Sequence, residues 1–489
     1  MAPIPAMDNA KQQQPWSDFR SSKAFIVIVV SIAIFADVFI YGMVIPLIPT
    51  ILRDRLNLPD DQLQKWLSIL LATFGGALLL SSPVIGYFAD KGSSRKPPFV
   101  IGLIAVAGST VMLWMARTPT AMIVARVLQG VADAAMWTVG NALVVDTVEK
   151  EQLGSAMGYV SMSMTVGTMA GPALGGILLD QAGYDSVFIL ALVMIGIDIV
   201  FRCLMIEPQS KKALRDRVDS EKDPLLARAG QPSYQATTGD EEQASPGRHH
   251  VVSTSSLPPI VRLAMSGQLL VVLLASIVDG ALWTSFESTI PVFVIKTFGW
   301  DSFEIGMSFF ALTIPAIISP IVGYAIDRYG PRVVSSLSFA SLMPIFIAFR
   351  FVTDDSLQSR IMFIALLVTT GFSFSAVLLP LMVEISEPIE RQEREFPGTF
   401  GDAGASGQVY GLHSSAWACG TLLGPILAGA LVETVGWKAM NLVLAAMSGG
   451  TAVLLVSTDD KVGQLVWRAW RAVAGFLGLS SGLNSRAGN

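Results

Sequence analysis

Twelve long apolar runs, arranged in two sets of six, constrain this chain more than any other feature of its sequence. A helix of about 20 apolar residues is long enough to cross the hydrocarbon core of a bilayer. The composition agrees, because 52% of the residues are hydrophobic and 15% are charged, whereas soluble domains carry about 25% charged residues. We therefore predict an all-α polytopic membrane protein with spans near 24–48, 66–88, 98–116, 120–144, 155–179, 185–206, 265–295, 303–326, 332–351, 359–383, 408–432 and 437–457.

The polar stretch between the two sets divides the chain into two six-helix bundles. Its mixture of charge, Ser, Gly and Pro is typical of a disordered linker. In the last segment, aromatic and apolar residues of 463–479 recur at helical spacing beside two arginines, which favours a helix on the membrane surface over a disordered tail. The polar start leads into a span too long for a signal peptide, so we expect no cleaved leader. The predicted segments are a tail 1–23, a bundle 24–206, a linker 207–262, a bundle 263–457 and a tail 458–489.

The distribution of charge predicts the orientation and excludes several classes of function. Lys and Arg outside the spans gather on the side that holds both termini and the linker, so we place that side in the cytoplasm. The net charge of −5 argues against a nucleic-acid partner. Cys203 and Cys419 lie far apart in apolar runs, and His249 and His250 lie in the linker, so neither pair predicts a disulfide or a metal site.

The sequence also lacks the motifs of an enzyme or of an ATP-driven pump. It contains no nucleophile–base set and no G-x-x-x-x-G-K-[ST] loop. We therefore expect no catalysis and no cofactor. If the chain moves solutes, an ion gradient must supply the energy.

The two halves repeat the same short motifs. The turn GYFADKGSSRK at 86–96 matches GYAIDRYGPR at 323–332. The run GTMAGPALGGILLDQAGY at 167–184 matches GTLLGPILAGALVETVGW at 420–437, and the two pairs are separated by similar lengths of chain. A six-plus-six duplication is typical of transporters in which two bundles rock about a central site. The repeat predicts two six-helix bundles related by pseudo-two-fold symmetry and an alternating-access mechanism.

At these residues the chain resembles the major facilitator superfamily, in particular its drug:proton antiporter branch with twelve spans. Three elements carry the resemblance. A cytoplasmic signature contains Gly86, Asp90, Lys91 and Arg95 and is echoed by Asp327 and Arg328 in the second half. An R-x-x-Q-G element in the fourth span contains Arg126. The motif G-x-x-x-G-P-x-x-G-G in the fifth span is complete, at Gly167, Gly171, Pro172, Gly175 and Gly176. Small residues at this spacing favour a close contact, which we expect between helices of opposite halves.

The resemblance implies a functional monomer that exchanges a small organic compound for protons. It is closest to fungal-type exporters of drugs, toxins or secondary metabolites in the plasma membrane, with vacuolar or vesicular membranes as alternatives. The chain departs from the pattern of this branch at Gly92-Ser93-Ser94. Members of the branch usually have a glycine just before the basic pair. The first and seventh spans are also similar, more distantly, to those of the vesicular monoamine and acetylcholine transporters.

Asp37 and Glu287 are the two acids that most need an explanation. Each lies within the first span of its half and precedes a proline. A charge at the bilayer centre costs at least about 2.5–3.5 kcal/mol. A carboxyl group there can gain and lose a proton during a transport cycle, or bind a cationic compound, and competition between the two would give antiport. The alternative is a protonated acid that only hydrogen-bonds to a neighbouring helix.

Other ionisable side chains in the spans have less certain roles by sequence alone. Arg126 and Asp133 lie two turns apart on one helix face and could be bridged by water or another helix. His413 could handle protons because its usual pKa lies near neutral pH, with helix packing as the alternative. We count all three with Asp37 and Glu287 as candidates for proton or substrate coupling. Asp198 and Arg202, four residues apart, are expected to neutralise each other. Asp146 and Glu384 at span ends are expected to be solvated. Asp279 belongs to the same intramembrane set without an assigned role.

Aromatic residues in the spans suit a cavity for bulky amphipathic or cationic compounds. The candidates for its walls are Phe39, Tyr41, Trp137, Trp283, Phe286 and Trp417. Two rival functions keep the same spans. A proton symporter or uniporter would share the fold and the acids, but the complete motif in the fifth span counts against it. A non-transporting receptor would not need Asp37, Arg126 and Glu287 inside the membrane.

Overall fold

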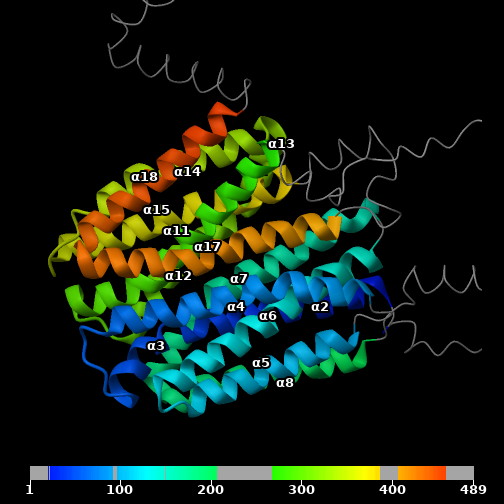
Figure 1. The fold of residues 1–489 in the computed structure, drawn as a ribbon, viewed down its shortest axis with the longest axis horizontal. Coiled ribbons are helices and arrows are strands. Elements are labelled where there is room, and N and C mark those ends of the chain that lie inside the picture. The colour runs from blue at the N-terminus through cyan, green and yellow to red at the C-terminus, as the bar shows by residue number, and fades with distance from the viewer. Residues whose placement is uncertain are drawn as a thin grey trace, which may run out of the picture.

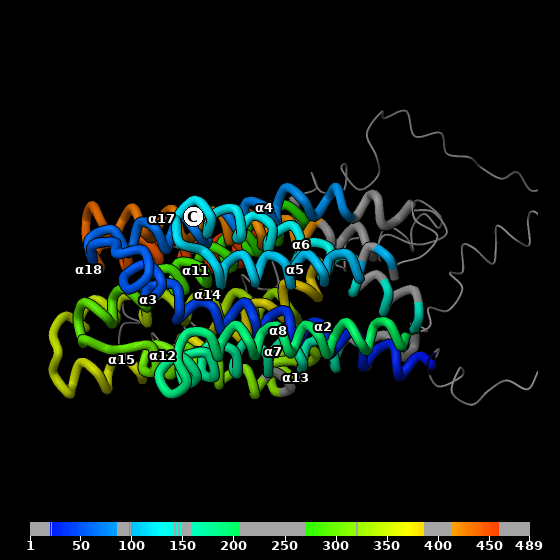
Figure 2. Tube along the Cα trace, turned by 90° about the horizontal axis from the view of Figure 1, so that it is seen from below, coloured from blue at the N-terminus to red at the C-terminus, as the bar shows by residue number. Residues whose placement is uncertain are grey.

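The computed structural model describes residue 20 and residues 22–91, 96–148, 150–205, 267–385 and 406–458. The described residues form helices that run roughly parallel to the long axis of the molecule (Figures 1 and 2). Residues 22–205 form one bundle and residues 267–458 the other, and the two lie side by side in Figure 1. The predicted fold class is confirmed. The linker 207–262, Arg95, His249, His250 and the segment 463–479 lie outside the described residues.

All twelve predicted spans correspond to helices. In the first bundle these are α2 (Lys23–Val44), α4 (Leu63–Lys91), α5 (Lys96–Met115), α6 (Pro119–Thr147), α7 (Lys150–Ala182) and α8 (Tyr184–Leu204). In the second bundle they are α11 (Gly267–Phe298), the pair α12 (Ser302–Thr313) and α13 (Ser319–Tyr329), α14 (Pro331–Phe349), α15 (Leu357–Glu384), α17 (Ser406–Thr434) and α18 (Gly436–Ser457).

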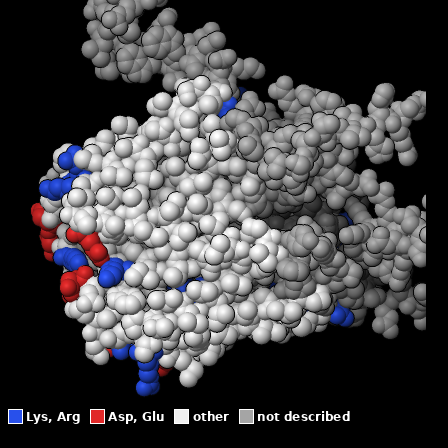
Figure 3. All heavy atoms as spheres, in the orientation of Figure 1, with Lys and Arg blue, Asp and Glu red and all other residues white. Residues whose placement is uncertain are grey.

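Ten of these helices are long and apolar enough to cross a membrane by themselves. The eighth span is bent by 51° between α12 and α13, where the short 3₁₀ helix η2 (Ile314–Ile318) contains Pro315. Proline lacks a backbone donor and clashes with the preceding turn, which explains the bend. The third span, α5, has a shorter apolar stretch at 99–115. Charged side chains gather at one end of the molecule in Figure 3 and leave a broad uncharged belt, as a membrane-spanning protein requires.

The two ends of the molecule differ. Short connections such as residues 183, 299–301 and 435 join the helices at one end, which we call the loop end. The opposite end, which we call the terminal end, holds residues 22, 205, 267 and 458, where the described bundles begin and finish. At the loop end the first span stops at Val44 rather than at 48, and continues after Pro46 as α3 (Leu47–Thr50) and the π-helix η1 (Ile51–Arg55).

Each bundle has its own hydrophobic core, and the glycine motif of the fifth span packs inside the first one. A Cβ atom on Gly167 or Gly171 would lie 2.8 or 2.5 Å from a backbone oxygen of α2, and one on Gly175 would lie 2.5 Å from the oxygen of Met43. Only glycine lets the two backbones approach this closely. The matching glycines Gly420 and Gly424 pack in the same way against α11.

This packing corrects one expectation about the motif. The sequence suggested a contact between helices of opposite halves, but Gly167, Gly171 and Gly175 contact a helix of their own bundle. Gly176 is the member that reaches across, because its backbone lies against Ser302 and Gly306 of α12. Pro172 contributes on both sides: its ring packs on Gly42 of α2, and its carbonyl oxygen lies against Gly306.

We predict that Gly171→Ala destabilises the protein. The added methyl group would collide with the carbonyl oxygen of Phe39, and overpacking of this kind costs about 1–3 kcal/mol. Thermal unfolding of the purified protein in detergent measures the loss. Gly196→Ala in α8 is the matched control, because a Cβ atom there has no neighbour within 4 Å. Equal melting temperatures for the two variants would contradict the role of this helix contact.

Candidate functional site

Asp37 lies in the middle of α2 and points into the first bundle, where it is 7% exposed. Its Oδ2 accepts a hydrogen bond of 3.0 Å from Nε1 of Trp137 in α6. Its carboxyl group lies next to that of Asp133, which is buried on the same helix as Trp137. Two carboxyl groups this close together and away from water favour a shared proton over two negative charges. The pair is therefore suited to hold a proton.

Glu287 lies on α11 of the second bundle and is held partly by the first. Its Oε2 accepts a 2.8 Å hydrogen bond from the hydroxyl group of Tyr41 in α2. Its Oε1 accepts a 2.8 Å hydrogen bond from Nε1 of Trp283, one turn earlier on α11. Glu287 itself is 3% exposed. The Tyr41–Glu287 bond joins the two bundles at a titratable group.

Arg126 of α6 is completely buried between these acids and forms an ion pair with neither in the described residues. Its Nη1 donates to Oε1 of Gln129 over 2.9 Å, while Nε and Nη2 have no hydrogen-bond partner in that part of the chain. Its guanidinium carbon lies 5.8 Å from the ring centre of Tyr41 and 5.9 Å from that of Phe74. The R-x-x-Q-G element thus places an isolated positive charge behind the Tyr41–Glu287 bond.

Sequence reasoning assigned no role to a fourth acid that the structure places in the same region. Asp279 of α11 is 4% exposed and lies beside the side chain of Trp417 of α17. The sequence contains a feature that could have singled out Asp279, because this acid lies as many residues before Pro291 as Asp37 lies before Pro49. His413, one turn before Trp417, lies with its Nδ1 3.0 Å from the hydroxyl oxygen of Ser276.

Four of the aromatic candidates surround these acids. Tyr41, Trp137, Trp283 and Trp417 are each half-buried, and each directs its polar atom at a carboxyl group. Phe286 was wrong as a cavity residue. Its ring is fully buried in the second core, 5.3 Å from both Phe346 and Phe349, because it points toward α14.

Two other predictions about charged residues have clear outcomes. Asp198 and Arg202 form the expected pair, at 3.3 Å between Oδ1 and Nε, with both side chains fully buried. Glu384 was expected to be solvated, and that was wrong. It is 5% exposed and ion-paired with Arg332 of α14 at 2.6 Å, because the end of α15 packs against the start of α14.

The cytoplasmic-signature residues lie at the terminal end. Gly86, Asp90 and Lys91 belong to the last turns of α4, while Asp327 and Arg328 are exposed at the end of α13. Arg328 donates to the hydroxyl group of Tyr324 over 3.3 Å. The side chains of Asp90, Lys91 and Asp146 are not among those described, so their pairing stays a prediction.

The two bundles touch between the middle of the helices and the loop end. Thr50 and Ser302 hydrogen-bond over 3.0 Å, and Gln64 donates to the carbonyl oxygen of Ser288 over 2.9 Å. Toward the terminal end of the same interface helices, Leu80, Tyr159 and Tyr324 are 75%, 62% and 62% exposed. The bundles are therefore closed at the loop end and diverge toward the terminal end.

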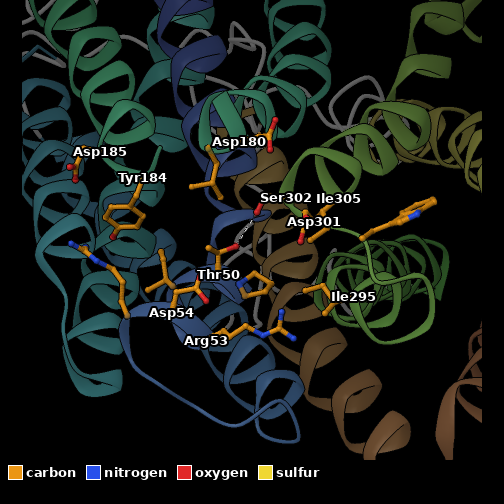
Figure 4. A pocket seen from close by; sticks show the side chains of 15 residues that line it. Thr50, Arg53, Asp54, Asp180, Tyr184, Asp185, Ile295, Asp301, Ser302 and Ile305 are labelled. Atoms are coloured by element: carbon orange, nitrogen blue, oxygen red, sulfur yellow. Dashed lines mark hydrogen bonds between the residues drawn. The ribbon is translucent and has the colours of Figure 1, made fainter. Parts of the chain in front are cut away.

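A pocket of about 500 Å³ lies at the loop end, beyond the closed contact (Figure 4). Both bundles line it, with Thr50 and Arg53 from the first and Asp301 and Ser302 from the second. Arg53 donates from Nε and Nη2 to the carboxylate of Asp60, and these bonds lower the pKa of Asp60. In the described part of the chain, no group of three or more His, Cys, Asp or Glu side chains could hold a metal ion.

Comparison with known proteins identifies the family. The sequence profile of the Major Facilitator Superfamily matches residues 30–397. The chain belongs to this superfamily. It is a multi-pass integral membrane protein with the fold of these transporters, and its family is not a class of enzymes.

Relatives and solved structures agree with this assignment. An uncharacterised MFS-type transporter of Schizosaccharomyces pombe is 33% identical over 85% of this chain and 91% of its own length. The MFS-type transporter ppzB of Metarhizium rileyi is 28% identical over 90% of this chain and 96% of its own length. The crystal structure of the human organic anion transporter MFSD10 is 19% identical, covers 88% of this chain and 99% of its own, and has a TM-score of 0.61, which shows a shared fold.

We predict that Asp198→Asn destabilises the first bundle without touching the acids between the bundles. Removing one member of a buried ion pair costs about 3–5 kcal/mol, because the partner charge stays buried. Unfolding in detergent measures this loss. The double variant Asp198→Asn with Arg202→Met should recover much of it, since no buried charge is then left alone. A single variant as stable as the wild type would contradict a structural role for the pair.

Proposed function

We propose that this transporter exports small amphipathic organic compounds in exchange for protons, by alternating access. The observation that carries the proposal is the 2.8 Å hydrogen bond between Tyr41 of the first bundle and Glu287 of the second. Alternating access requires contacts between the bundles to break and re-form in each cycle. A contact that ends on a carboxyl group can respond to a proton.

The physical link runs through the charge of Glu287. Hydrogen bonds to an ionised acceptor are roughly twice as strong as those to a neutral one. Protonation of Glu287 therefore weakens its bonds to Tyr41 and Trp283, and it removes a negative charge from the neighbourhood of buried Arg126. Loss of the proton restores both. The Asp37–Asp133 pair holds a proton on the facing bundle, so protons can be bound on both sides of the interface.

The walls of the site support an amphipathic substrate. Half-buried Tyr41, Trp137, Trp283 and Trp417 offer aromatic surface beside carboxyl groups. Aromatic faces and carboxylates both attract organic cations. A compound that displaces the proton from Asp37 or Glu287 would be exchanged for it.

Orientation and direction follow from charge and from the relatives. With the terminal end in the cytoplasm, as the distribution of Lys and Arg predicts, the diverging end faces the cell interior, and the plasma membrane is the expected location. The proposed direction, export, is supported by similarity to proteins whose names refer to drug resistance. A putative multidrug resistance protein MdtD of Citrobacter koseri is 33% identical over 31% of this chain and 32% of its own length.

Asp37→Asn tests the coupling. Purified protein is placed in liposomes with an imposed pH gradient and an internal pH dye, and is given a panel of amphipathic cations, neutral drugs and polyketide-like acids. We expect at least one compound to drive proton flux, and the flux to fall at least about tenfold in the variant. Glu433→Gln, which changes an exposed acid at the end of α17, is the control and should match the wild type. Binding without proton movement, equal in all three proteins, would contradict antiport.

A cross-link across the loop end tests alternating access. Thr50→Cys with Ser302→Cys places two thiols where hydroxyl oxygens lie 3.0 Å apart on opposite bundles, in a background with Cys203 and Cys419 replaced by serine. Oxidation should abolish flux of the compound found above, and reduction should restore it. Ser341→Cys with Ser373→Cys, 2.7 Å apart within the second bundle, is the matched control. Equal flux through the first pair, oxidised or reduced, would exclude opening at this end.

A further inference from the structure

A polar stripe runs along one face of α11. Ser276, Asp279, Trp283 and Glu287 follow each other at spacings of three, four and four residues, which places them on the same side of a helix. The stripe is about 16 Å long. It begins near the terminal end and finishes at Tyr41, where the bundles meet. Glu287 belongs to the proposed coupling site, whereas we treat Asp279, Ser276 and the hydrogen-bond partner of Ser276, His413, as a separate group.

Close packing fixes this group in the wall of the second bundle. The backbones of α11 and α17 approach at Gly280 and Gly420, where an added Cβ atom would collide with the carbonyl oxygens of Trp417 and Ile277. The side chains beside these glycines are held in place as a result. Asp279 and His413 are 4% and 3% exposed, while the neighbouring Trp417 is half-buried.

The hydrogen bonds also assign a direction to His413. The hydroxyl oxygen of Ser276 lies 2.9 Å from the carbonyl oxygen of Val272 and 3.0 Å from Nδ1 of His413. The hydroxyl group has one hydrogen, so both contacts are hydrogen bonds only when Ser276 donates to Val272 and Nδ1 of the ring donates to Ser276. In that arrangement a neutral histidine has Nε2 as its proton acceptor.

Charged groups that could neutralise Asp279 are remote. The helices packed against α11 are chiefly α17, α15, α18 and α4. The titratable side chain nearest on these helices is His413, one turn along α17 from Trp417, and Glu287 lies two turns along α11 itself. Glu384 is at the terminal end, paired with Arg332. The remaining charged side chains described on these helices are at the loop end: Lys65, Arg360, Glu433 and Lys438.

We propose that Asp279 is a second proton-binding carboxyl group, in the second bundle, and that His413 carries protons between it and the terminal end. Its place in the sequence supports this, because Asp279 precedes Pro291 by the same separation as Asp37 precedes Pro49, and each acid lies beside a tryptophan of another helix. The proton binds a carboxylate oxygen of Asp279 and leaves through water and Nε2 of His413. The transporter then has one protonatable acid site in each bundle besides Glu287.

Infrared difference spectroscopy of the protein in lipid tests the proposal with protons as the only ligand. A pH step produces a band from each carboxyl group that gains or loses a proton. We expect Asp279→Asn to remove one band that is retained in Asp37→Asn, in Glu287→Gln and in the exposed-site control Glu433→Gln. Asp279→Glu should keep a shifted band. Identical spectra for Asp279→Asn and the wild type, with both eluting as folded protein, would overturn the proposal.

The role of His413 is tested by the rate of the same signal. After a pH jump, His413→Gln should slow the appearance of the Asp279 band at least about tenfold while leaving its amplitude unchanged. Ser276→Ala should slow it less, because the ring stays in place without its hydrogen-bond acceptor. An unchanged rate in His413→Gln would remove His413 from the path. Since no substrate is used, the result is independent of the flux assay above, so antiport can fail while this site stands.

Discussion

The close approach of glycine-lined helices is the constraint on which the rest of this structure depends. Gly167, Gly171 and Gly175 let α7 lie against the backbone of α2, and Gly420 and Gly424 do the same for α17 and α11. In a membrane there is little hydrophobic drive between helices, so association relies on packing and hydrogen bonds. The helices that carry the acids, α2 and α11, are thereby fixed against their own bundles. The bundles can then move as units.

A further constraint is the presence of carboxyl groups buried away from water. An unpaired charge away from water is costly, and each buried carboxyl group here has polar partners. Asp37 has Trp137 and Asp133, Glu287 has Tyr41 and Trp283, and Asp279 has Trp417. Neutral donors stabilise a carboxyl group without fixing its charge, whereas a direct ion pair such as Asp198–Arg202 fixes it. This difference separates the acids suited to bind protons from those that only stabilise the fold.

The sequence predicted the fold almost completely, because the signals for membrane spans are strong and local. Hydrophobic runs gave all twelve helices, and the repeated motifs indicated the two bundles. Predictions failed where they required knowledge of which helix lies next to which. Phe286 is as aromatic as Trp283, but its ring packs on Phe346 of α14, whereas the indole of Trp283 hydrogen-bonds to Glu287. Glu384 is at a span end, as expected, yet Arg332 of another helix buries it in an ion pair.

The sequence by itself determined that the chain crosses a membrane, that its halves repeat, and that acids lie inside the spans. These properties depend on the free energy of transferring residues from water to lipid and on short-range motifs, so they can be read along the chain. Only the tertiary structure decided that Asp133 meets Asp37, that Glu287 is held by Tyr41 of the other bundle, and that His413 meets Ser276. Each of these contacts joins residues on two different helices. Helix packing determines the contacts, because the close approach of two backbones at glycine decides which side chains can touch.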